Sequence, residues 1–303
     1  MSNLLSLFAN NLLPILITAA AGFLVQKFLG LSPRPLSQVA FYLLSPALVF
    51  SLLLAAEIPS TQILAMMGFA AAVVLIVAVA SLLLSRALSL GPKLAAAVLL
   101  STAFMNAGNY GLSLNQFVYG EGGLTWASLY FVASMMLTNS LGVFAASRGQ
   151  RGPLAAFREL AKIPAVYAIP LALAVRSLGV TLPAPISRPI ALLGAAAVPV
   201  MLLILGMQIG SGRAITNRGL LAACVGLRLV LAPLAAWLIA PYFGLDGLAR
   251  QVGVLESAMP TAVMSTIIAI EFDVEPAFVT GVVLVTTLLS PLTLTPLIAL
   301  LAT

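Results

Sequence analysis

The polar residues of one uncharged stretch are the first candidates for chemistry in this chain. Residues 94–120 carry no charged side chain, yet their central segment, AFMNAGNYGLSLNQ, contains Asn106, Gly108, Asn109 and Tyr110. Asn106 and Asn109 are three residues apart and so share one face of a helix, where their amides would supply donors and acceptors to the same ligand. Small and polar residues also serve close packing between membrane helices, which is the alternative interpretation.

Two charged side chains lie within otherwise apolar stretches. Glu256 is in 250–270, and Arg228 is in 219–243. A charge inside a membrane is costly unless it is paired, so both residues are functional candidates. Glu256 has three alternative roles: a sodium ligand, a proton carrier or the structural partner of Arg228. Arg228 would pair with a substrate carboxylate through its forked donors, or with Glu256; we favour the pair with Glu256 because it requires no substrate.

The composition places these residues in an integral membrane protein. Of the 303 residues, 62% are hydrophobic and 7% are charged, whereas about a quarter of the residues of a soluble protein are charged. The chain has no histidine, a single cysteine (Cys224) and no glycine-rich phosphate loop, so it lacks the usual proton shuttle, an internal disulfide and a site for ATP. These absences argue against an enzyme and against an organic cofactor. The net charge of +6 indicates topology and not nucleic-acid binding.

Ten stretches are long enough to cross a bilayer, which takes about 20 mostly apolar residues. The uncharged stretches are 1–26, 35–56, 58–85, 94–120, 122–147, 189–212 and 276–303. The stretches touched by a charge are 163–180, 219–243 and 250–270. The sequence therefore predicts an all-α polytopic membrane protein with ten transmembrane helices.

The basic residues of the connecting segments predict the orientation. Lys and Arg gather on the cytoplasmic side of membrane proteins. If the N-terminus is outside, the cytoplasmic loops contain Lys27, Arg34, Arg86, Lys93, Arg148, Arg151, Arg158, Lys162, Arg213 and Arg218. The outer side then has only Arg176, Arg188 and Arg250. We therefore expect a multi-pass protein of the plasma (inner) membrane with both termini outside.

The two halves of the chain resemble each other. The segment FYLLSPALVFSLLLAAEIPS matches LLGAAAVPVMLLILGMQIGS when Pro46 is placed on Pro199, an offset of 153 residues. The segment VLLSTAFMNAGNYGL matches VGVLESAMPTAVMST when Met105 is placed on Met259, an offset of 154. Two separate segments thus agree on nearly the same shift, which indicates an internal repeat.

Each repeat contains five of the ten spans. The first repeat is 1–147, a short cytoplasmic loop is 148–162, and the second repeat is 163–303. An odd number of spans inverts the second repeat relative to the first. Inverted repeats with matching interrupted helices are typical of secondary transporters.

Both repeats contain helix-breaking residues at equivalent places. Gly108 and Gly111 weaken the 94–120 helix, and Pro260 removes an amide from the 250–270 helix. A break inside a membrane is tolerated only where protein or a cavity satisfies the freed backbone groups. We therefore expect the two broken helices to cross near the midplane, where amide ends attract an anion and carbonyl ends coordinate a cation.

The predicted substrate site combines this crossing with other polar positions. Ser45 and Pro46 would line the fixed side of the pocket, although proline in a membrane helix is also a plain kink. Ser134, Thr138 and Asn139 would add polar groups from 122–147. The complete predicted set is Asn106, Gly108, Asn109, Tyr110, Pro260, Thr261, Ser45, Pro46 and Arg228.

At these residues the chain resembles the auxin efflux carrier family in its short bacterial form. Members carry an Asn-x-Gly motif followed by Gly-Leu-Pro-Leu or a similar run. Here Asn106-Ala107-Gly108 is followed by Gly111-Leu112-Ser113-Leu114, with Ser113 at the position of the proline. The resemblance covers all ten spans, and the middle loop is shorter than in many plant members.

The resemblance implies a fold shared with bile-acid/sodium symporters. A scaffold, through which two copies can pair as a homodimer, would consist of 1–26, 35–56, 163–180 and 189–212. The other six helices would form a transport domain that moves against it in an elevator-type mechanism. Family substrates are small organic anions: auxin in plants, malonate and related carboxylates in bacteria.

The resemblance also implies a coupling ion. The symporters carry a glutamate just before the crossing that helps to bind sodium, and Glu256-Ser257-Ala258-Met259-Pro260 is similar to it. Glu256 with the backbone of Ser257 and Met259 would hold one sodium ion, and Asn106 with the Ser128 hydroxyl would complete another. The alternatives are a proton-coupled carrier or uniporter of the same fold, or a membrane sensor or channel without transport coupling.

Overall fold

The computed structural model describes residues 4–147, 161–209 and 217–302, and within these ranges it consists of helices and connecting segments, with one isolated β-bridge and no strand. The elements before the middle loop are α1 (Leu4–Leu7), η1 (Phe8–Leu12), α2 (Leu13–Leu29), α3 (Pro33–Val39), η2 (Ala40–Leu44), α4 (Ser45–Ala55), α5 (Ser60–Ala87), α6 (Pro92–Ala103), η3 (Ala107–Leu112), α7 (Ser113–Leu137), η4 (Thr138–Gly142) and α8 (Val143–Ala146). The elements after it are α10 (Pro164–Ser177), α11 (Ala184–Ile209), α12 (Arg218–Gly226), η5 (Leu227–Leu231), α13 (Ala232–Ile239), η6 (Ala240–Phe243), α14 (Gly247–Ser257), α15 (Val263–Glu271) and α16 (Pro276–Leu301).

Seven helical runs in the described residues are long and apolar enough to cross a membrane. They are Leu4–Leu29, Pro33–Ala55, Ser60–Ala87, Ala107–Ala146, Ala184–Gln208, Arg218–Phe243 and Pro276–Leu301. Two shorter apolar helices are Pro92–Ala103 and Pro164–Ser177. The chain is therefore an all-helical, multi-pass membrane protein, because a helix satisfies its own backbone groups in hydrocarbon.

The Ala107–Ala146 run turns sharply at Gly120. This residue has φ 67° and ψ −155°, a conformation outside the helical region that only glycine adopts readily. The predicted middle loop, 148–162, lies almost entirely outside the described residues, and so do the predicted cytoplasmic Arg148, Arg151, Arg158 and Arg213.

Some of the short π-helical turns precede prolines within the long helices, as η2 and η5 do. The η2 turn comes directly before α4, in which Pro46 is the second residue, and η5 comes before Pro233 at the start of α13. Proline has no amide hydrogen, so the regular bonding pattern is broken there and a wider turn fits. The Ser45 hydroxyl follows this wider turn and donates to the carbonyl of Ala40, five residues earlier, at 2.7 Å.

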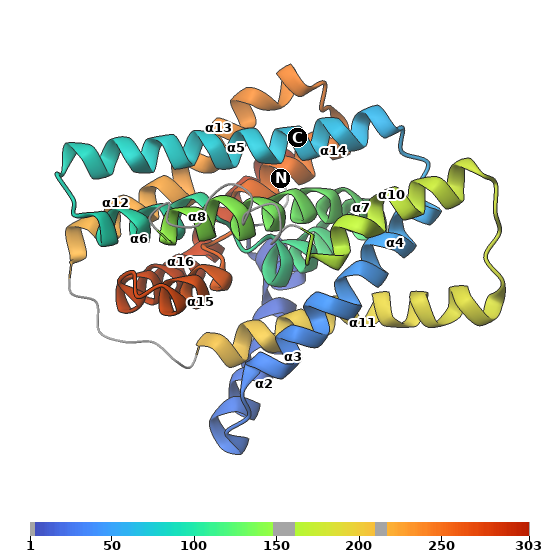
Figure 1. The fold of residues 1–303 in the computed structure, drawn as a ribbon, viewed down its shortest axis with the longest axis horizontal. Coiled ribbons are helices and arrows are strands. Elements are labelled where there is room, and N and C mark those ends of the chain that lie inside the picture. Colours follow the sequence, from blue (N-terminus) through green and yellow to red (C-terminus); the bar gives the residue numbers. More distant parts are fainter. Residues whose placement is uncertain (1–3, 148–160, 210–216, 303) are drawn as a thin grey trace.

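The helices pack as two groups (Figure 1). In the first group, α11 packs along both α2 and α4, and α10 packs along α4. In the second, α5 packs on α6 and α7, α14 packs on α7, and α15 packs on α16. Glycine permits the closest contact in the first group: a Cβ at Gly206 of α11 would overlap the Ala19 backbone of α2.

Candidate functional site: the helix crossing and its cavity

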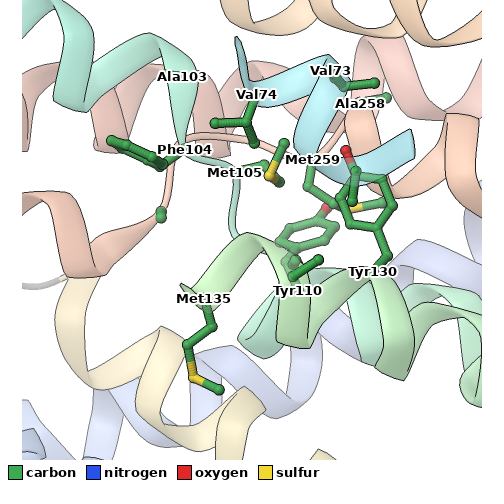
Figure 2. Close-up of a cluster of buried hydrophobic side chains, with 14 of the residues drawn as sticks. Val73, Val74, Ala103, Phe104, Met105, Tyr110, Tyr130, Met135, Ala258 and Met259 are labelled. Atoms are coloured by element: carbon green, nitrogen blue, oxygen red, sulfur yellow. The ribbon is translucent and has the colours of Figure 1, made fainter. Parts of the chain in front are cut away.

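Two interrupted helices meet at the centre of the second group. The chain leaves α6 at Ala103 and re-enters a helix at Ala107, and it leaves α14 at Ser257 and re-enters at Val263. We call the two non-helical segments, 104–106 and 258–262, the crossing. Figure 2 shows Phe104 and Met105 on one segment and Ala258 and Met259 on the other.

The two segments of the crossing pair with each other as a minimal antiparallel ladder. Met105 and Thr261 form an isolated β-bridge. The Asn106 amide donates to the Pro260 carbonyl at 2.7 Å, and the Ala262 amide donates to the Phe104 carbonyl at 2.9 Å. Backbone groups freed by the breaks are thus satisfied by the other broken helix, as a buried break in a membrane requires.

The predicted crossing is confirmed, but the expected role of the glycines is wrong. The break lies at 104–106, before Gly108 and Gly111, and both glycines are within η3. They provide room instead: a Cβ at Gly108 would lie 2.8 Å from the Phe131 ring, and one at Gly111 would overlap the Glu256 carboxylate. Pro260 lies within the break as predicted, and its carbonyl is one of the two acceptors in the ladder.

The carbonyl end of α6 is covered by side chains from the second half of the chain. The last four carbonyls of a helix have no partner within it. The hydroxyl of Ser265 donates to the Leu100 carbonyl at 2.7 Å, and that of Thr261 donates to the Ser101 carbonyl at 2.6 Å. Nη1 of Arg228 donates to the Thr102 carbonyl at 2.9 Å and to the Ala103 carbonyl at 3.5 Å.

The amide ends of the crossing face a cavity of about 140 Å³. On one side it is lined by α4 and α11 of the first group together with α3 and η2, and on the other by η3, α7, η4 and α15 of the second. The first residues of η3, from Ala107 to Asn109, and the first residue of α15, Val263, are part of the wall. The first amides of a helix lack partners within it and carry a partial positive charge, so both helix starts favour an anion.

One buried side chain in this wall has an unused donor. Asn106 is 5% exposed, and its Nδ2 has no hydrogen-bond partner among residues 4–147, 161–209 and 217–302. Among the described residues, those that line the cavity include polar and apolar side chains but none that is charged. These described residues would therefore hold an anion through amides.

The predicted substrate residues divide into two sets. Ser45, Asn106, Gly108 and Asn109 line the cavity, and so do the predicted Ser134, Thr138 and Asn139. Pro46, Tyr110, Pro260, Thr261 and Arg228 are absent from its lining.

Tyr110 and Thr261 take part in packing around the crossing. The Tyr110 hydroxyl accepts a bond from Ser290 of α16 at 3.3 Å, and Tyr110 is fully buried. In Figure 2 its ring lies beside that of Tyr130, close to Met259. The Thr261 amide donates to the Thr286 hydroxyl at 3.1 Å, so both polar ends of Thr261 bind protein.

The expected ion pair between Arg228 and Glu256 is wrong. Arg228 is fully buried and donates only to backbone carbonyls, the third of which is Ser257 at the end of α14. Glu256, also fully buried, accepts a bond from Nδ2 of Asn115 at 3.0 Å through Oε1, and its Oε2 has no partner in the part of the chain that the structure describes. The guanidinium is bonded to the carbonyl ends of two helices and not to the carboxylate of Glu256.

Two of the predicted sodium ligands are already bonded within the protein. The Ser257 carbonyl accepts from Arg228, and the buried Ser128 hydroxyl donates to the Thr125 carbonyl of its own helix at 2.7 Å. Met259 is buried in the crossing, and Asn106 has a buried Nδ2 without a partner among the described residues. Oε2 of Glu256 is a fully buried oxygen without a partner among the described residues.

Asn115 is the main residue that the sequence prediction missed. Its Nδ2 bonds both the Gly111 carbonyl and Glu256, each at 3.0 Å, and its Oδ1 has no partner within the described residues. The signal was its position four residues after Gly111, on the same face of the helix. Gln208, Met201 and Ile204 of α11 also line the cavity, and no motif in the sequence distinguishes them from the rest of that helix.

A model of the membrane transport protein family matches residues 7–298 of the chain. The chain belongs to this family, that of the auxin efflux carriers. It is therefore a membrane transport protein and not an enzyme. The expectation drawn from the Asn106–Leu114 motif is confirmed.

Two archaeal members of this transport family are similar to the chain. An uncharacterized transporter from Methanothermobacter thermautotrophicus is 30% identical over 194 residues, and the match covers 63% of each chain. An uncharacterized transporter from Methanocaldococcus jannaschii is 23% identical over 291 residues, covering 91% of this chain and 93% of the relative. Both similarities agree with transport, and neither names a substrate.

Proposed function

We propose that the protein is a secondary active transporter of a small organic anion, a carboxylate of the malonate or auxin kind. The observation that carries the proposal is the meeting of two helix amide ends and the unpartnered amide of Asn106 at one cavity. Amides arranged in this way favour a carboxylate over a neutral or cationic solute.

The proposed mechanism is elevator-type alternating access. The cavity lies between the group of α2, α4, α10 and α11 and the group that contains the crossing. The first group would be the scaffold, through which two copies would pair, and the second would carry the substrate across. Movement of one rigid group along the other exposes a site at their boundary to each side in turn.

The proposed topology has ten spans in two inverted repeats. It counts the Ala107–Ala146 run as two helices divided at Gly120, joins α6 to η3 across one break, and joins α14 to α15 across the other. The excess of Lys and Arg in the odd-numbered loops supports both termini outside a plasma (inner) membrane. External protease applied to right-side-out vesicles would cleave a tag on Met1; protection of the tag would contradict this orientation.

Sodium is the proposed coupling ion, with Glu256 and Asn115 as its side-chain ligands. Each has a buried oxygen that no other described residue bonds, and sodium is bound by oxygen atoms. A proton carried by Glu256 is the second candidate, because a lone buried carboxylate is favourable when it is neutral.

A thermal unfolding experiment tests the anion and the ion together. The purified protein would be heated with a panel of mono- and dicarboxylates, each in sodium or in potassium. A ligand that binds only the folded state raises the Tm by mass action, by several degrees when it is present at about 100 times its Kd. We expect a carboxylate to raise the Tm only in sodium, and Glu256→Gln to remove that dependence.

The possible results separate the parts of the proposal. An equal shift in potassium would leave the anion site in place and replace sodium with the proton. Absence of any shift across the panel, together with no carboxylate uptake by proteoliposomes, would overturn the anion site itself.

A further inference from the structure

We propose that Arg228 is a positioning residue that acts as a resident cation of the crossing. Its guanidinium occupies the point at which the carbonyl ends of the two broken helices meet. It is attached to the chain and is not exchanged with solution. The inference deepens the proposed carrier function, although its contacts and its test do not depend on that function.

The contacts of Arg228 join the two broken helices. Nη1 donates to the carbonyls of Thr102 and Ala103, the last two residues of α6, at 2.9 and 3.5 Å. Nη2 donates to the carbonyl of Ser257, the last residue of α14. One planar fork therefore holds two helix ends that come from opposite halves of the chain.

The positive charge of Arg228 balances the partial negative charges at the carbonyl ends of α6 and α14. The carbonyl end of a helix is equivalent to about half a negative elementary charge, so two ends together amount to about one. The guanidinium is always protonated and supplies one positive charge. Arg228 is fully buried, where screening by water is weak and such compensation has its greatest effect.

The contacts of Arg228 differ from both roles that the sequence predicts, which are an ion pair with Glu256 and an ion pair with a substrate carboxylate. Arg228 makes no hydrogen bond or ion pair with Glu256, whose one bonded oxygen accepts from Asn115. Arg228 is also absent from the lining of the cavity, where a substrate carboxylate would lie. The amide ends of the crossing thus face the cavity, and the carbonyl ends face Arg228.

This arrangement has a consequence for the coupling ion. Carbonyl helix ends at a crossing are otherwise suited to bind a cation from solution. Here the Ser257 carbonyl, one of the predicted sodium ligands, is already bonded to the protein's own cation. The crossing itself therefore needs no exchangeable cation, and any coupling ion would bind at Glu256 and Asn115.

Chemical rescue tests the inference. Arg228→Ala leaves two uncompensated helix ends and a space of guanidinium size, and we expect the Tm to fall by about 10 °C. Guanidinium at about 20 mM, where its denaturing effect is small, should restore part of that loss. Urea, which has nearly the same shape but no charge, should not.

Arg176→Ala is the matched control. Arg176 also donates to two backbone carbonyls, those of Ala56 and Ile58, but it is half-buried at the end of α10. Neither guanidinium nor urea should raise the Tm of this variant or of the wild type. Equal rescue of Arg228→Ala by urea, or no rescue by guanidinium, would overturn the role of the charge.

Two further variants keep the inference testable if Arg228→Ala does not fold. Arg228→Lys retains the charge and Arg228→Met removes it at similar length, so the Lys variant should have the higher Tm.

Adding Glu256→Gln to Arg228→Met should not raise the Tm. A rise would show that Arg228 balances the carboxylate, which would overturn the inference. These measurements use no carboxylate, so their failure is distinct from failure of the proposed transport function.

Discussion

Gly111 lies directly against the carboxylate of Glu256, so that a Cβ at position 111 would overlap the carboxylate oxygens. The two residues come from opposite halves of the chain and from different interrupted helices. The absence of a side chain at 111 makes room for a fully buried carboxylate beside the crossing. The glycine in the motif is therefore explained by a residue that lies far away in the sequence.

Gly111→Ala should move the Glu256 carboxylate and destabilise the fold by about 1–3 kcal/mol, the usual cost of overpacking a buried site. Thermal unfolding with and without sodium measures both the loss of Tm and the loss of any sodium-dependent shift. Gly226→Ala is the matched control, because a Cβ at this helical glycine meets no atom within 4 Å. A Gly111→Ala protein with the wild-type Tm would contradict the close contact.

Asn115→Ala should leave Oε1 of Glu256 without its donor. An unsatisfied buried acceptor costs about 1–3 kcal/mol, so the Tm should fall, and any ion bound at Glu256 should bind more weakly. Measuring the Tm over a range of sodium concentrations tests both effects. Asn11→Ala is the control, since the Asn11 amide bonds only the Leu7 carbonyl of its own helical run, at 3.0 Å. Equal sodium responses in the two variants would exclude Asn115 from the ion site.

Asn106→Asp should weaken anion binding at the cavity without a comparable loss of fold. The Asn106 donor has no partner to lose, but a carboxylate there would repel a substrate carboxylate, and we expect at least a roughly tenfold rise in the KM for uptake. Asn217→Asp is the control: Asn217 caps α12 by accepting from the Leu220 amide at 3.1 Å, and aspartate caps equally well. Unchanged uptake by Asn106→Asp would remove this residue from the site.

Cross-linking tests the movement of one helix group against the other. In a Cys224→Ala background, Ile204→Cys in α11 and Met264→Cys in α15 place thiols on opposite walls of the cavity. A bifunctional thiol reagent should then abolish uptake, and a reducing agent should restore it. The control pair, Lys93→Cys with Asp273→Cys, replaces an ion pair within the second group and should permit uptake after cross-linking. Full uptake by the cross-linked cavity pair would contradict elevator motion.

The sequence predicted those features that depend on local composition. Apolar runs predict membrane helices because hydrocarbon leaves the backbone no other partner, and Pro260 predicts the second break because it lacks an amide hydrogen. Offsets between similar segments predicted that the two breaks would meet. The first break was placed several residues too late, because the ladder between Met105 and Thr261 ends α6 before either glycine is reached.

The partners of the buried polar groups were decided only by the tertiary structure. From sequence alone, opposite charges at Arg228 and Glu256 favour an ion pair, yet each binds another group. The carbonyls of Thr102, Ala103 and Ser257 are identical in kind to every other carbonyl of the chain. They become strong acceptors only because two helices end at the same place. Composition determines which residues enter the membrane, but the packing of the two halves determines which helix ends need a charge.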